Sequence, residues 1–97
     1  MILSIHPLAE GELSEGAAYY MREGSRELGE SFVSEFERAV GMLREYPKLG
    51  AHWGGKLRRL PVRRFPYSIV YALSGDTLRV LALAHQRREP GYWRGRK

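Results

Sequence analysis

Residues 57–85 decide the fold, and they read LRRLPVRRFPYSIVYALSGDTLRVLALAH. Short runs rich in apolar residues alternate here with turn residues around Pro66 and Gly75. This pattern predicts three strands, over residues 57–64, 67–73 and 77–85. Connections this short do not allow a parallel crossover, so we expect an antiparallel meander.

The two turns also give a register for the meander, because side chains alternate between the two faces of a sheet. One face then holds large apolar side chains that suit packing under helices: Leu60, Val62, Ile69, Tyr71, Leu81 and Leu83. The other face holds arginines and smaller residues: Arg59, Arg63, Ser68, Val70, Ala72, Val80, Ala82 and Ala84. We expect this second face to form a groove that binds another chain.

The chain before the meander predicts a short edge strand over residues 2–5 and then two helices. Pro7 fits the first turn of a helix, and Gly24 supplies its stop. Three acidic residues near its start favour the helix dipole: Glu10, Glu12 and Glu15. A second apolar stripe begins at Leu28 and ends before Pro47. The short gap between the helices predicts an antiparallel hairpin, so the expected class is α+β, with the N-terminal strand and the hairpin packed on the small meander.

Length and composition indicate one globular domain spanning residues 1–97, with 43% hydrophobic and 28% charged residues. There is no cysteine, which excludes a disulfide framework, a zinc ribbon and a thiol nucleophile. No apolar stretch is long enough to span a bilayer, and no secretory signal is visible. We therefore expect a cytoplasmic protein without membrane association.

Charge is segregated along the chain. Up to Gly50 nine Glu stand against five Arg and Lys, a balance of −4. From Ala51 onward eleven Arg and Lys stand against two acidic residues, a balance of +9. The second half is therefore expected to face a polyanion or an acidic partner.

Metal and cofactor chemistry find little support. The only aspartate, Asp76, lies beside Gly75 in a turn, which leaves no Ser-His-Asp triad. The three histidines are widely spaced and lack a ligand signature: His6, His52 and His85. The glycines match neither a P-loop nor a dinucleotide fingerprint. We expect no metal and no cofactor.

The candidate catalytic residues lie at and after the end of the last strand: His85, Arg87, Arg88 and Tyr92. A histidine among arginines can move a proton while the arginines hold phosphates, which is the minimum for metal-free RNA cleavage. Tyr92 and Trp93 can stack a base. In the structural alternative His85 caps a strand, Trp93 closes the core edge, and the arginines are solvated.

An ordered set of short features runs through the chain: Tyr19 and Tyr20, Leu28 and Gly29, Phe32, Pro47, Gly50, the run from Arg59 to Tyr67, and the strand end from Val80 to Gln86. With the order strand, helix hairpin, meander, this set resembles the RelE/ParE toxins of type II toxin–antitoxin systems. The resemblance covers nearly the whole chain and is closer to the ParE branch.

The resemblance implies a growth-inhibiting toxin, of the kind that stabilises plasmids, neutralised by a cognate antitoxin protein. ParE-like members poison DNA gyrase, whereas RelE-like members cleave mRNA on the translating ribosome. The long hairpin with its Leu-Gly turn and the His-Gln pair after the last strand favour gyrase as the target, and hence a protein that is not an enzyme. A non-toxic binding module that has kept the fold is the third reading.

The RelE pattern places basic residues where this chain has Arg59, Pro61 and Ser68, so only Arg59 keeps the charge. The C-terminal arginine of the RelE pattern falls near Gln86 or Arg87, and its C-terminal tyrosine falls at Tyr92. Another nuclease branch uses a Glu, an Arg and a His near the end of the last strand. His85 could be the histidine of such a set, but the sequence shows no convincing Glu partner for it. The antitoxin is expected to bind the second sheet face at Arg59, Arg63, Val70, Val80 and Ala82. The sequence leaves open whether the protein forms a homo-oligomer or a hetero-oligomer.

Overall fold

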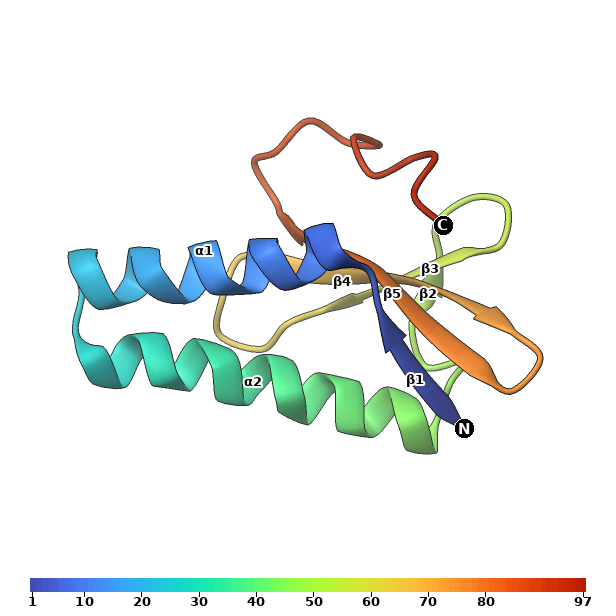
Figure 1. Cartoon of the computed structure of the whole chain (residues 1–97), viewed down its shortest axis with the longest axis horizontal. Helices are drawn as coiled ribbons and strands as arrows, with labels where there is room; N and C mark the ends of the chain where they lie inside the picture. Colours follow the sequence, from blue (N-terminus) through green and yellow to red (C-terminus); the bar gives the residue numbers. More distant parts are fainter.

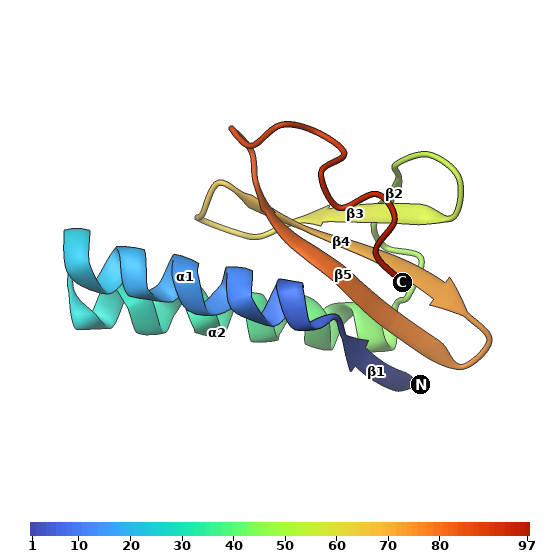
Figure 2. The same cartoon turned by 45° about the horizontal axis from the view of Figure 1, so that its top comes forward.

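A computed structural model describes residues 1–97. Its elements, in chain order, are β1 (Ile2–Ile5), α1 (Pro7–Glu23), α2 (Arg26–Glu45), β2 (Ala51–His52), β3 (Leu57–Pro61), β4 (Tyr67–Ser74) and β5 (Thr77–His85). The strands form one sheet in the order β1-β5-β4-β3-β2. The two helices cover one face of this sheet, and the segment after β5 crosses the other face (Figure 1 and Figure 2). The predicted α+β architecture is confirmed.

The helix hairpin begins and turns where local capping predicts. His6 caps α1, because its Nδ1 accepts a hydrogen bond from the Leu8 N–H at 3.0 Å. Ser25 caps α2 in the same way through the Leu28 N–H at 3.1 Å. The helices approach closely at Gly16, where a Cβ would lie 2.6 Å from the ring of Phe32. Neither helix has the length and hydropathy that crossing a membrane requires.

The meander of β3, β4 and β5 is antiparallel, as predicted. β1 is the edge strand that the sequence indicates, and it pairs with β5 in parallel, with Ile2 opposite Thr77. The two-residue strand β2 was not predicted; it covers part of the free edge of β3. β3 ends at Pro61 rather than at residue 64, because the backbone turns at Arg64, whose φ is +73°.

The predicted register is confirmed for most of the helix-facing side chains but wrong for Val80 and Leu81. Val70 pairs with Ala82, whereas the next residue, Tyr71, pairs with Val80. Leu81 is therefore an extra residue, and such a β-bulge shifts the alternation of faces by one residue. Val80 consequently lies in the core beneath the helices, on the face opposite the one predicted.

The second sheet face is not an open groove. Residues 86–97, called here the C-terminal segment, fold back over it, and Trp93 packs on Val70, Ala82 and Ala84. Val70 and Ala82 are 0% exposed. The prediction of an open surface was wrong because the small side chains in the middle of the sheet receive an indole from the same chain. The alternative in which Trp93 closes the core edge is confirmed.

Candidate functional site

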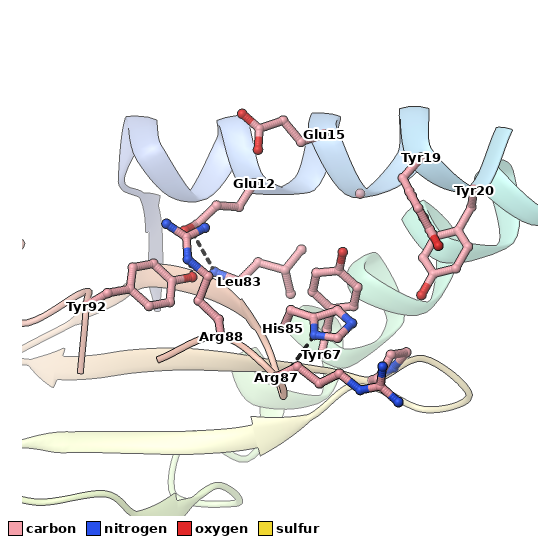
Figure 3. A pocket seen from close by; sticks show the side chains of 12 residues that line it. Glu12, Glu15, Tyr19, Tyr20, Tyr67, Leu83, His85, Arg87, Arg88 and Tyr92 are labelled. Atoms are coloured by element: carbon pink, nitrogen blue, oxygen red, sulfur yellow. Dashed lines mark hydrogen bonds between the residues drawn. The ribbon is translucent and has the colours of Figure 1, made fainter. Parts of the chain in front are cut away.

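A cavity of about 590 Å³ opens between α1 and the end of β5; we call it the α1 cavity (Figure 3). All four predicted catalytic residues line it: His85, Arg87, Arg88 and Tyr92. The helix contributes two carboxylates and two phenols, and β4 contributes a third phenol: Glu12, Glu15, Tyr19, Tyr20 and Tyr67. The structure therefore brings the predicted residues together and adds acidic side chains that sequence reasoning did not pair with His85.

His85 is held in one orientation at the end of β5. Its Nδ1 accepts a hydrogen bond from the Arg87 backbone N–H at 3.0 Å. A neutral imidazole that accepts at Nδ1 carries its proton at Nε2, which leaves Nε2 as the nitrogen available to a ligand. The ring also meets the Tyr67 ring edge to face, with centroids 5.0 Å apart.

The arginines beside His85 carry free positive charge. Arg87 and Arg88 make no ion pair with any carboxylate of the chain. The Arg88 guanidinium lies 4.3 Å above the centre of the Tyr92 ring, which fixes its plane and leaves its N–H edge free. Both side chains are therefore available to an anion.

Glu12 joins α1 to β5 and to the C-terminal segment; we call this group, with Leu83, Tyr92 and Arg96, the Glu12 clasp. Glu12 Oε1 accepts from the Leu83 N–H at 3.0 Å and from Arg96 at 3.0 Å. Its Oε2 accepts from the Tyr92 hydroxyl at 2.7 Å and from Arg96 at 3.2 Å. The Glu12 and Arg96 side chains are each 13% exposed.

The clasp gives Glu12 a different role from the one predicted. The sequence places Glu12 near the start of a helix, where an acidic residue commonly serves the dipole, but its carboxylate instead accepts from groups remote in the chain. Its partner Arg96 is 84 positions away, and no spacing rule reports such a contact. Sequence reasoning therefore had no signal for this pair.

Tyr92 is committed to the clasp as a hydrogen-bond donor. Burial, and then its hydrogen bond to Glu12, raise the pKa of Tyr92 well above its ordinary 10.0. The phenol therefore keeps its proton at neutral pH and does not serve as a base there. Its ring, stacked under Arg88, is its second contribution to the site.

The structure does not bring the five predicted antitoxin-binding residues together. Arg59 stacks on the Trp53 ring at 3.8 Å, beside Val70. Arg63 is exposed in the turn between β3 and β4, and Val80 lies on the opposite face. Ala82 is beneath Trp93. Of the five predicted residues, only the two arginines, Arg59 and Arg63, remain accessible.

Comparison with known proteins decides the family. The sequence profile described as "ParE toxin of type II toxin-antitoxin system, parDE" matches residues 3–90. The chain belongs to the ParE toxin family. A solved structure described as "Chromosomal ParDE TA system from P. aeruginosa" matches this ParE family member with a TM-score of 0.77. The two are 20% identical, and the match covers 88% of this chain and 95% of that chain. Likeness at this identity shows a shared ParE fold. No curated protein matches the sequence.

Proposed function

We propose that this ParE family member is a growth-inhibiting toxin that acts on DNA gyrase and is neutralised by a cognate antitoxin. The observation that carries the proposal is the extent of the profile match, residues 3–90, which spans the helix hairpin and all of the sheet except Ile2. The fold shared with a solved ParDE system supports the same proposal.

The sheet face supports gyrase rather than the ribosome as the target. Of the strand positions that are basic in the RelE pattern, only Arg59 carries charge here. Pro61 has no donor, and Ser68 is 5% exposed. Two of the three strand positions that are basic in the RelE pattern therefore supply no positive charge here, which weakens the phosphate contacts that dominate nucleic-acid affinity.

Expression of the protein without a partner in a bacterial host is expected to stop growth. The gyrase proposal further predicts an SOS response without mRNA cleavage, because a poisoned gyrase leaves broken DNA. Growth curves, an SOS reporter and mapping of mRNA ends measure these effects. Co-expression of the protein encoded by the adjacent gene is expected to restore growth, and an empty vector is the control.

Each contrary outcome overturns a different part of the proposal. Normal growth, with folded protein accumulating, would show a binding module that has kept the fold. Growth arrest with cleaved mRNA on translating ribosomes would replace gyrase with the ribosome. Arrest that the adjacent gene product does not relieve would remove that product as the antitoxin.

The α1 cavity favours metal-free RNA cleavage as the second candidate function. His85, with its Nε2 free, lies beside two unpaired arginines, and Glu15 of α1 is among the residues that line the same cavity. In such cleavage the 2′-oxygen attacks phosphorus and the bond to the 5′-oxygen breaks. One group takes the 2′ proton and another protonates the leaving oxygen, while arginines stabilise the phosphate.

If RNA is cleaved, His85→Ala is expected to lower the cleavage rate at least ~100-fold, because general acid–base catalysis contributes about that much or more. The variant should remain folded, since the His85 ring is not part of the core cluster. His52→Ala, which removes an exposed imidazole from β2, is the matched control. Cleavage by His85→Ala at the original rate would exclude His85 from the mechanism.

A further inference from the structure

A second, smaller cavity of about 90 Å³ lies on the sheet face away from the helices, beside the C-terminal segment. We call it the Arg59 cavity. Its polar lining comes from Arg59, Ser68, His85, Gln86 and Arg88, and the lining contains no carboxylate. His85 and Arg88 also line the α1 cavity, so they form the wall between the two.

Two guanidinium groups of the Arg59 cavity are fixed in place by aromatic rings. The Arg59 guanidinium lies 3.8 Å above the Trp53 ring, and that of Arg88 lies 4.3 Å above the Tyr92 ring. Neither arginine has an ion-pair partner in the chain. Stacking restricts each plane while its N–H groups stay free at the edge, which is the arrangement that binds an oxyanion through paired hydrogen bonds.

The indole N–H of Trp93 provides an independent indication of a ligand. Trp93 is 4% exposed, its Nε1 is buried without a hydrogen-bond partner, and the residue lines the Arg59 cavity. Buried N–H groups are normally hydrogen-bonded, because an unpaired one costs free energy. Together with the two guanidiniums, it gives a site rich in donors and poor in acceptors. The complementary occupant accepts hydrogen bonds and carries negative charge.

The surroundings favour a carboxylate from a protein over a phosphate from a nucleic acid. Next to the cavity, Arg59 covers a face of Trp53 and Arg88 covers a face of Tyr92, while Trp93 is 4% exposed. A base that stacked on either of these two faces would therefore have to displace an arginine. An acidic side chain needs only the donors and the small volume that the cavity supplies.

We propose that the Arg59 cavity binds the carboxylate of a Glu or Asp side chain of the antitoxin. This inference rests on the proposed function, because it needs an antitoxin. The arginines are contributed by β3 and by the C-terminal segment, so one acidic side chain would contact both parts of the chain. The +9 balance of the second half of the chain attracts an acidic partner to this face.

The test measures the affinity of the toxin for the antitoxin encoded by the adjacent gene, by isothermal titration calorimetry. Arg59→Gln and Arg88→Gln are each expected to weaken binding ~10-fold, and the double variant ~100-fold. Arg59→Lys should recover little of the loss, because an ammonium lacks the planar fork of the guanidinium. Arg44→Gln removes the same charge from the exposed end of α2 and is expected to bind like the unmodified toxin.

The outcomes separate this inference from the proposed function. Unchanged affinity of the folded double variant, with tight binding by the unmodified toxin, would overturn the cavity assignment and leave the antitoxin proposal standing. Loss of binding to a labelled single-stranded oligonucleotide, with antitoxin affinity unchanged, would assign the cavity to phosphate and overturn the carboxylate. Failure of the unmodified toxin to bind the antitoxin would overturn both. Arg88→Glu should also weaken antitoxin binding. If replacing one acidic residue of the antitoxin with arginine restores binding to this variant, that residue is the one whose carboxylate the cavity binds.

Discussion

Glu12→Ala is expected to lower the free energy of unfolding by ~3–5 kcal/mol, the usual cost of removing one partner from a buried ion pair. The substitution leaves Arg96 without its carboxylate and the Leu83 N–H without its acceptor, and both groups are largely buried. Glu12→Gln should cost less, because the amide oxygen can still accept one of these hydrogen bonds. Urea denaturation followed by circular dichroism measures the difference.

The same substitution is expected to loosen the C-terminal segment. The chain has two tryptophans, Trp53 and Trp93, whose ring centroids are 6.3 Å apart, so fluorescence reports on their packing. Release of Trp93 from the sheet should shift the emission to longer wavelength. Glu15→Ala is the matched control, since Glu15 lies in the same helix and cavity, is exposed and makes no ion pair. Equal stability and emission for the two alanine variants would contradict a structural role for the clasp.

Phe32→Ala is expected to lower the free energy of unfolding by ~3–5 kcal/mol, because it leaves a cavity where a large ring was buried. Phe32 is 0% exposed, and its ring lies 4.8 Å from that of Tyr67 and 5.1 Å from that of Phe65, centre to centre. The gap is not easily filled, because Gly16, which lies against the Phe32 ring, has no side chain that could move into it. Thermal and urea unfolding measure the loss.

This substitution also tests how the α1 cavity is built. Tyr67 and Tyr20 both line the cavity and both contact the Phe32 ring, so their positions depend on it. Tyr46→Ala provides the comparison, because it removes an aromatic ring that follows α2 and is 61% exposed. Its expected effect is within about 0.5 kcal/mol, as for most surface substitutions. A loss for Phe32→Ala as small as that for Tyr46→Ala would show that the hairpin does not depend on this contact.

Local patterns were sufficient to predict the helices and the meander. Helix α1 begins at Pro7 and ends before Gly24, as predicted. A proline in the first turn and a glycine at the C-terminal end of a helix act through the backbone next to them. The turn at Gly75 likewise requires a positive φ, which is +56° there. These features depend on neighbours in the chain, and periodicity reports on them directly.

Contacts between remote residues were not predictable in the same way. The bulge at Leu81 depends on how β4 and β5 fit together, and the five residues around it show no glycine or other local sign. The four residues predicted to be catalytic share one cavity because they lie close together in the sequence, at and after the end of β5. The Glu12 clasp was missed because its carboxylate and Arg96 are 84 positions apart. A single sequence contains no distance information of that range.

The parallel pairing of β1 with β5 has a consequence for how the chain folds during synthesis. Ser4, in β1, accepts a hydrogen bond from Arg79 across 75 positions of sequence, and the clasp joins positions 84 apart. Contacts of such separation close large loops and form late. The helix hairpin can assemble as soon as the ribosome has released it, but the sheet has no partner for its first strand until the last strand exists. A nascent chain therefore acquires the folded sheet only after β5 has left the ribosome.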